Sequence, residues 1–306
     1  MITQKGNKIY RRQDKELLCI EPWGKNSFRV RATQRYEFVP EDISALLPPQ
    51  ECEVKVLEED DCTVIENGKI RCEITPTGKL RFKNQDGKLL LEEFERIRAD
   101  YRKEYNSALE IVPRTFEPHQ NTDNFRLTVR FEPIDGEKLY GMGQYQQPYL
   151  DVKGCTLELA QRNSQASVPF VLSNNGYGFL WNNPAIGQVS FGKNVTEWTA
   201  VSTKQMDYWI TAGDTPAEIE EAYADATGKV PMMPDYGTGF WQCKLRYMTQ
   251  DEILEVAREY KRRKLPISVI VVDYFHWPNQ GDWKFDTDFW PDPKAMVEEL
   301  KEMGIE

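Results

Sequence analysis

The chain has 306 residues, of which 40% are hydrophobic, 12% aromatic and 29% charged, a composition typical of a globular protein long enough for two domains. Its net charge of −10 argues against nucleic acid and anionic membranes as partners, because phosphate groups are bound by basic surfaces. No stretch reaches the roughly 18 apolar residues of a membrane span, and the first residues lack the apolar core of a secretory signal, so a cytoplasmic location is expected.

Six cysteines are spread over the chain without a CxxC pair, and the sequence contains only 2 histidines. A zinc site needs such ligands at characteristic spacings, so no metal site is predicted. The thiols are expected to stay reduced and mostly buried. The cysteines are Cys19, Cys52, Cys62, Cys72, Cys155 and Cys243.

The first domain is predicted to span residues 1–231 and to be all-β. Short segments alternate apolar and polar residues, among them 27–32, 70–74 and 125–131, and turn sequences rich in Asn, Asp and Gly separate them. This pattern is typical of a large antiparallel β-sandwich.

One helix is predicted at the end of this domain. Thr215 and Glu218 have the spacing of a capping box, and Pro216 stands at the first helical position. Two prolines within residues 230–234 then interrupt regular structure. The domain boundary is therefore expected between residues 231 and 232.

The second domain, residues 232–306, is predicted to alternate strands and helices. A short strand precedes an amphipathic helix whose capping box begins at Thr249. An apolar, β-branched run from Leu265 to Val272 follows, which is typical of a parallel strand buried on both faces. Asp292 begins a second helix, and Ile305 stands where a third strand would start. The order is βαβα, which indicates a parallel sheet.

A possible binding site follows the apolar run. Asp273 stands where the run ends, and the aromatic residues Tyr274, Phe275 and Trp277 come directly after it. Ligands of parallel α/β folds bind at the carboxyl ends of the strands. Rings next to carboxylates suit a sugar, because rings stack on its C–H faces and hydroxyl groups need charged acceptors. The alternative is that Asp273 caps a turn and the rings only pack.

The loop after this site has two other features. Asp282, Asp286 and Asp288 are spaced like calcium ligands, but Pro293 stands where the last glutamate of such a loop belongs, so a solvated acidic loop is favoured. His276 has no cysteine or second histidine near it in the sequence. It is expected to be hydrogen-bonded in the loop and not to bind a metal.

Several motifs occur in an order that resembles glycoside hydrolase family 31, and they cover nearly all of the chain from about residue 135 onward. They are YGMGQ at 140–144, VPFVLSNNGYGFLW at 168–181, YWITAGDTP at 208–216, the Asp273 strand, and FWPDP at 289–293. The resemblance implies an all-β sandwich of the galactose-mutarotase-like type, followed by the first βαβα part of a (β/α)8 TIM barrel. It also implies hydrolysis of α-linked xylosides or glucosides with retention, without a metal or organic cofactor.

The resemblance assigns roles to the residues of the candidate site. Asp273 matches the aspartate that binds sugar hydroxyls at the end of the second barrel strand. Phe275 and Trp277 would provide stacking walls. Tyr274 stands beside the place of the C6 hydroxymethyl group of glucose, where α-glucosidases carry a modest aliphatic side chain. Its ring would fill that volume, so xylose is preferred over glucose.

The chain departs from the family pattern at two positions. Family members usually have an aspartate after an arginine in a sandwich loop that reaches the sugar, and this chain has Arg162-Asn163. Asn163 would therefore offer a neutral hydrogen bond in place of a charge. Leu245 stands after the first barrel strand, where some members have an aromatic residue.

The resemblance places both catalytic aspartates later than Glu306, one on the fourth barrel strand and one after the sixth. No catalytic residue is therefore expected in these 306 residues, and the chain alone is expected to be inactive. The complete protein is expected to act on small oligosaccharides, and a homo-oligomer is compatible with the sequence. The alternatives are an α-glucosidase within the same class and a non-catalytic carbohydrate-binding or scaffold protein. Aspartates at the two expected positions after Glu306 would distinguish an enzyme from the latter.

Overall fold

The computed structural model describes residues 2–40, 44–49, 51–59, 61–97 and 110–306. These residues form two compact units, Met1–Lys229 and Val230–Glu306. The units therefore divide between Lys229 and Val230, close to the boundary expected from the sequence. Each unit is described by itself below.

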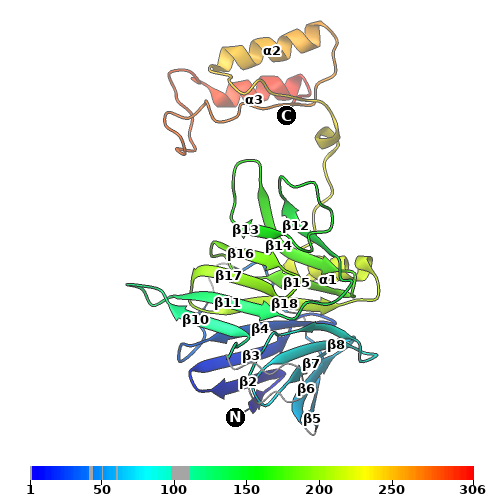
Figure 1. Cartoon of the computed structure of the whole chain (residues 1–306). Helices are drawn as coiled ribbons and strands as arrows, with labels where there is room; N and C mark the ends of the chain where they lie inside the picture. The colour runs from blue at the N-terminus through cyan, green and yellow to red at the C-terminus, as the bar shows by residue number, and fades with distance from the viewer. Residues whose placement is uncertain (1, 41–43, 50, 60, 98–109) are drawn as a thin grey trace. The chain divides into compact units, whose positions relative to one another are not determined.

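Unit 1 contains an eight-stranded antiparallel sheet in the order β1-β2-β3-β4-β18-β15-β14-β12 (Figure 1). The centre of the sheet pairs β4 with β18, which joins the beginning of the unit to its end. The strands are β1 (Ile2–Lys5), β2 (Lys8–Gln13), β3 (Glu16–Pro22), β4 (Ser27–Thr33), β12 (Leu139–Gln144), β14 (Ala166–Ser173), β15 (Tyr177–Trp181) and β18 (Met206–Ala212).

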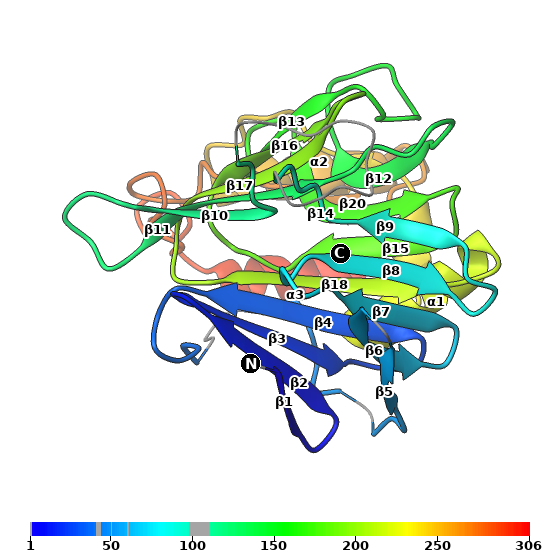
Figure 2. The same cartoon turned by 60° about the horizontal axis from the view of Figure 1, so that its bottom comes forward.

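Two five-stranded sheets complete unit 1, in the orders β5-β6-β7-β8-β9 and β10-β11-β17-β16-β13 (Figure 2). An antiparallel bridge between Glu93 and Phe131 links them. The strands of the first are β5 (Lys55–Glu59), β6 (Cys62–Asn67), β7 (Ile70–Ile74), β8 (Leu80–Asn84) and β9 (Leu89–Glu92). Those of the second are β10 (Arg114–Pro118), β11 (Phe125–Phe131), β13 (Thr156–Leu159), β16 (Gly187–Phe191) and β17 (Thr196–Thr203).

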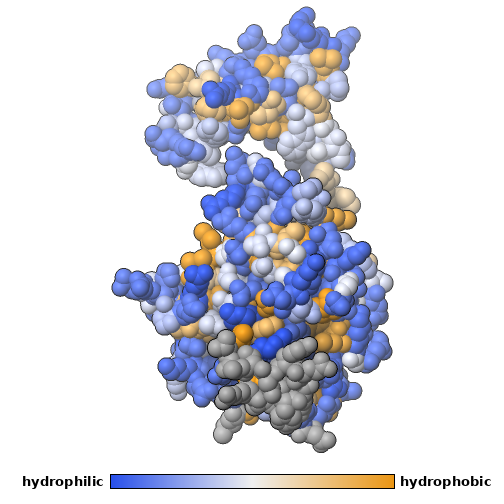
Figure 3. Space-filling view, viewed as in Figure 1, coloured by the Kyte–Doolittle hydropathy of each residue, from blue (hydrophilic) through white to orange (hydrophobic). Residues whose placement is uncertain are grey.

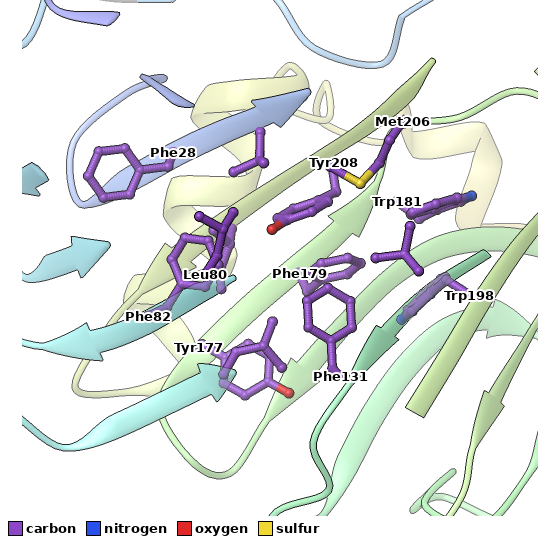
Figure 4. Packing of buried hydrophobic residues seen from close by; sticks show 14 of the residues in the cluster. Phe28, Leu80, Phe82, Phe131, Tyr177, Phe179, Trp181, Trp198, Met206 and Tyr208 are labelled. Carbon is purple, nitrogen blue, oxygen red and sulfur yellow. The ribbon is translucent and has the colours of Figure 1, made fainter. Parts of the chain in front are cut away.

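One hydrophobic core holds the three sheets of unit 1 together. Phe82 from β8, Phe131 from β11 and Tyr208 from β18 meet in it, with ring centroids 6.3 Å apart for Phe82 and Tyr208 and 5.9 Å for Phe131 and Tyr208. Figure 4 shows Phe131 and Tyr208 beside Phe179, and Phe82 beside Leu80. Burial of each such side chain contributes about 2–3 kcal/mol. The predicted β-sandwich is confirmed, because its layers share this core.

The predicted helix α1 (Pro216–Thr227) is confirmed and covers the other face of the eight-stranded sheet. Thr215 Oγ1 accepts a hydrogen bond from Glu218 N at 3.2 Å, which caps the helix. Ile219 and Ala226 pack in a second cluster with Trp209 of β18. Because β18 packs on the core with one face and on α1 with the other, all of its residues are buried.

Unit 2 has the predicted βαβα order: β19 (Trp241–Gln242), α2 (Gln250–Arg262), β20 (Val269–Ile270) and α3 (Pro293–Glu302), with a 3₁₀ turn at Asp235–Thr238 before them. The two strands pair in parallel. On the other edge of β20, Ile270 N donates to Glu306 O and Glu306 N donates to Ser268 O, both at 2.9 Å. Residues 305–306 therefore lie where a third strand begins.

The strand predicted from Leu265 to Val272 is much shorter in the structure. Only Val269 and Ile270 are assigned to β20, and Val271 and Val272 are half-buried. Backbone hydrogen bonds connect this stretch to residues 240–242 on one side and to Glu306 on the other. The length of β20 is therefore set by the neighbouring segments that pair with it. The apolar sequence of the run does not determine that length.

Figure 3 shows hydrophilic residues over much of the visible surface of each unit, interrupted by smaller apolar areas. Within the described ranges, no helix combines the length and apolar character that crossing a bilayer requires.

Candidate functional site

The predicted site begins with a sharp turn at Asp273, just beyond β20. Asp273 has φ +66°, in the left-handed region. This conformation costs an L-residue about 1–2 kcal/mol, and Asp tolerates it better than most because its short polar side chain can hydrogen-bond locally. The chain thus leaves the strand direction at once, and Trp277 N donates to Tyr274 O at 3.2 Å to close the next turn. The three predicted rings consequently gather at the carboxyl end of β20.

The rings after Asp273 contact one another. Tyr274 and Phe275 are stacked, with centroids 4.4 Å apart and planes 25° apart. The ring centroid of Trp277 lies 6.1 Å from that of Tyr274 and 5.1 Å from that of Trp283. Tyr274 remains 40% exposed, so its ring is held by stacking while part of it faces solvent.

The rings of Tyr274, Phe275 and Trp277 line a cavity of about 260 Å³ within unit 2. Its wall is largely apolar, which suits the C–H face of a pyranose ring. Asp273 is not among the lining residues, so the structure brings three of the predicted site residues together around this cavity and leaves Asp273 beside their turn. The lining residues are Met248, Thr249, Tyr274, Phe275, Trp277, Gln280, Asp286 and Phe289.

Sequence reasoning missed part of this wall. Thr249 was interpreted only as the start of α2, and Met248 and Gln280 were not considered. Asp286 was assigned to a solvated loop, but it is the carboxylate of the cavity wall. Its backbone N–H donates to His276 O at 2.7 Å and its Oδ1 accepts from Asp288 N at 3.1 Å. The aromatic and acidic composition of the loop was the only sequence signal for these contacts.

His276 lies inside an aromatic cluster under the loop. Its ring centroid is 4.9 Å from Phe285 and 5.4 Å from Trp277, and the fully buried Trp290 lies 6.4 Å away. Its buried Nδ1 has no hydrogen-bond partner among the described residues, while a backbone hydrogen bond with Asp273 acts on the imidazole. Burial lowers the pKa of His276 below its usual value.

Asn163 belongs to unit 1, at the tip of the loop between β13 and β14. Arg162 and Gln165 form an isolated bridge below the tip, and Ser164 takes a positive φ of 68° there. Arg162 Nη2 donates to Glu158 Oε1 at 2.6 Å, so the arginine of the expected pair is held back against its own strand. Asn163 is exposed. Its implied contact with the sugar stays a prediction.

Within the part of the chain that the structure describes, no three His, Cys, Asp or Glu side chains gather as metal ligands would. The acidic loop residues Asp282, Asp286 and Asp288 are accordingly considered only as part of the cavity and its surroundings.

Two family models match the chain. The first is the Glycosyl hydrolase 31 N-terminal galactose mutarotase-like domain, over residues 17–189. The second is the Glycosyl hydrolases family 31 TIM-barrel domain, over residues 230–306. The chain belongs to glycoside hydrolase family 31. The resemblance drawn from the ordered motifs is confirmed, as is the fold of a β-sandwich followed by the opening part of a TIM barrel.

The relatives of this family 31 chain include named α-xylosidases. It is similar to the crystal structure of a family 31 α-xylosidase from a soil metagenome complexed with xylose, with 59% identity, a TM-score of 0.93, and coverage of 100% of this chain and 46% of that chain. It is 55% identical to an uncharacterized family 31 glucosidase of Pseudescherichia vulneris, over 99% of this chain and 59% of that protein. An α-xylosidase of Saccharolobus solfataricus is 36% identical over 61% of this chain and 27% of its own length. The chain thus spans 27% to 59% of the length of these relatives.

Proposed function

We propose that the complete protein is a retaining glycoside hydrolase that removes terminal α-linked xylose from oligosaccharides. Membership of family 31 supports the reaction class. Two of the relatives described above carry the name α-xylosidase, one of them in a complex with xylose, which supports xylose over the alternative of glucose. In this mechanism one carboxylate attacks the anomeric carbon and another donates a proton to the leaving oxygen, about 5–5.5 Å away. Both are expected later than Glu306.

The proposal gives this chain the task of binding and selecting the sugar. Asp273 accepts hydrogen bonds from sugar hydroxyls, and these bonds lower the barrier if they strengthen in the transition state. Phe275 and Trp277 stack on the C–H faces of the substrate. Support for these roles comes from the turn at Asp273, which gathers the rings around one cavity.

Tyr274 is proposed to select xylose over glucose. This is the observation that carries the proposal: the ring follows Asp273 directly, lines the cavity and is stacked on Phe275 at 4.4 Å. The stack opposes rotation of the ring away from the wall. A substrate with a C6 hydroxymethyl group meets the ring, whereas xylose has no such group.

The test is a paired assay of the complete enzyme on 4-nitrophenyl α-xyloside and 4-nitrophenyl α-glucoside. The xyloside is expected to have the higher kcat/KM, and NMR during turnover is expected to detect α-xylose as the first product. Preference for the glucoside would contradict the selection, and β-xylose as the first product would contradict retention.

Two further expectations belong to this proposal. The 306-residue chain alone should not hydrolyse either substrate, because both catalytic carboxylates are expected outside it. The location is proposed to be the cytoplasm, and the free thiols buried in unit 1 fit a reducing compartment. These thiols are Cys19, Cys62 and Cys72.

A further inference from the structure

Unit 1 contains a cavity of about 460 Å³ that is formed entirely by its own residues. Segments far apart in the sequence form its walls. Trp23 and Lys25 come from the β3–β4 turn, Leu47 from the following loop, and Glu221 and Asp225 from α1. The volume lies within the roughly 300–1,000 Å³ of small-molecule sites.

Hydrogen bonds between these segments hold the walls in place. Trp23 Nε1 donates to Leu47 O at 3.0 Å, and Leu47 N donates to Ala226 O at 2.8 Å. Trp209 Nε1 donates to Trp23 O at 3.0 Å, and the Arg29 guanidinium lies 4.6 Å from the Trp23 ring centroid. A site with walls formed before binding loses less entropy when a ligand enters.

The charges of the wall favour a neutral ligand. The Lys69 ammonium group forms salt bridges with Glu218, at 2.9 Å, and with Asp214. Lys25 and Glu221 also line the cavity, and both are exposed. An anion would face Glu221, and a cation would face Lys25, whereas Asp225 is already paired with Lys229, with Oδ1 and Nζ 3.1 Å apart. A polyhydroxylated molecule can instead donate hydrogen bonds to the carboxylates and accept one from the ammonium group.

The same wall also offers apolar surface. The half-buried Trp23 ring, Leu47 and two prolines line it beside Ala222. Apolar patches next to charged acceptors are what a pyranose needs, as its C–H faces and its hydroxyl groups are satisfied separately. We propose that this cavity is a second carbohydrate-binding site, which holds one or two sugar units of a neutral saccharide apart from any catalytic step. The proposal does not depend on the activity proposed above.

The test measures maltose binding to the 306-residue chain by isothermal titration calorimetry. The double variant Lys25→Ala/Glu221→Ala removes one donor and one acceptor, both exposed, so its Tm should match that of the wild type. Hydrogen bonds to charged groups contribute enough that the double variant is expected to bind at least about tenfold more weakly. Glu220→Ala is the matched control, because Glu220 is an exposed carboxylate on the same helix that does not line the cavity.

A second comparison separates this site from the one in unit 2. Asp273→Ala should leave maltose binding unchanged if the sugar enters unit 1. The proposal is overturned if the wild type does not bind maltose, if Lys25→Ala/Glu221→Ala binds as tightly as the wild type, or if Asp273→Ala alone abolishes binding. It is also overturned if inorganic phosphate displaces maltose, which would indicate an anion site. Loss of glycosidase activity in the complete enzyme would leave this result unaffected.

Discussion

Replacing Tyr274 by isoleucine tests the proposed sugar selection at its source. In the structure the Tyr274 ring is 40% exposed, stacked on Phe275 at 4.4 Å, and part of the wall of a 260 Å³ cavity. Tyr274→Ile removes the ring and opens the volume that a hydroxymethyl group would need. The lost ring pair contributes about 0.5–1.5 kcal/mol to stability, so the variant should still fold.

The size of the expected change in substrate preference follows from the free energy that overpacking costs when a substrate group meets a part of the cavity wall that a side chain already fills. Such overpacking costs about 1–3 kcal/mol, and differences of one methylene-sized group change specificity by about 10- to 200-fold. The ratio of kcat/KM for 4-nitrophenyl α-xyloside to that for the α-glucoside should therefore fall by about ten- to a hundredfold in Tyr274→Ile. The gain should come mainly from faster turnover of the glucoside.

Tyr274→Phe is the matched control for this assay. It keeps the ring and its stacking on Phe275 but removes the hydroxyl group, so the ratio should stay close to that of the wild type. The reasoning would be refuted by a wild type that prefers the glucoside, or by an isoleucine variant with an unchanged ratio. If the phenylalanine variant shifts as far as the isoleucine variant, the hydroxyl group selects the sugar and the ring volume does not.

Three other predictions follow from the described contacts. Asp273→Ala in the complete enzyme should lower kcat/KM by one to two orders of magnitude, because each charge-assisted hydrogen bond is worth about 1.5–3 kcal/mol. The Tm measured by calorimetry should barely change. A much lower Tm with normal activity of the folded fraction would instead show that Asp273 has a structural role. Arg114→Met should lower the free energy of unfolding, measured in urea, by about 3–5 kcal/mol, since it leaves the fully buried Glu93 carboxylate unpaired. Arg130→Met breaks a more exposed pair and should lower it by less than about 1 kcal/mol. Equal decreases in the two variants would contradict the argument. Burial lowers the pKa of His276 from its usual 6.5, so the unfolded chain binds the proton first and stability should fall as the pH drops through 6.5. The Tm of His276→Phe should fall less than that of the wild type over this range. If the Tm of both proteins falls equally, other groups cause the effect.

Local chemistry was sufficient to predict the helices and the general layout of both units. Thr215 and Thr249 each accept a hydrogen bond from the backbone N–H three residues later, at 3.2 Å in both helices. Asp292 does the same for Ala295 at 2.9 Å. These bonds join residues that are neighbours in the sequence, so the sequence pattern contains both partners. The change from a period of two to a helical period likewise identified the sandwich and the βαβα part.

The length of β20 and the conformation of Asp273 depended on distant partners. The apolar run before Asp273 predicted a strand ending at Val272, but its backbone hydrogen bonds to neighbouring strand segments, residues 240–242 and Glu306, involve residues 268–271. The left-handed φ of Asp273 follows where that pairing ends. Composition shows that a segment can form a strand, whereas its length is set by the neighbours available in the fold.

The sequence indicated only part of the composition of the two cavities, and the tertiary structure decided the rest. The sequence predicted Tyr274, Phe275 and Trp277 as site residues because they follow a strand end, and all three line the cavity of unit 2. It did not predict Met248 on the same wall, nor the cavity of unit 1, where Trp23 meets a helix that begins at Pro216. Residues so far apart in the chain become neighbours only through sheet pairing and core packing, which no local pattern encodes.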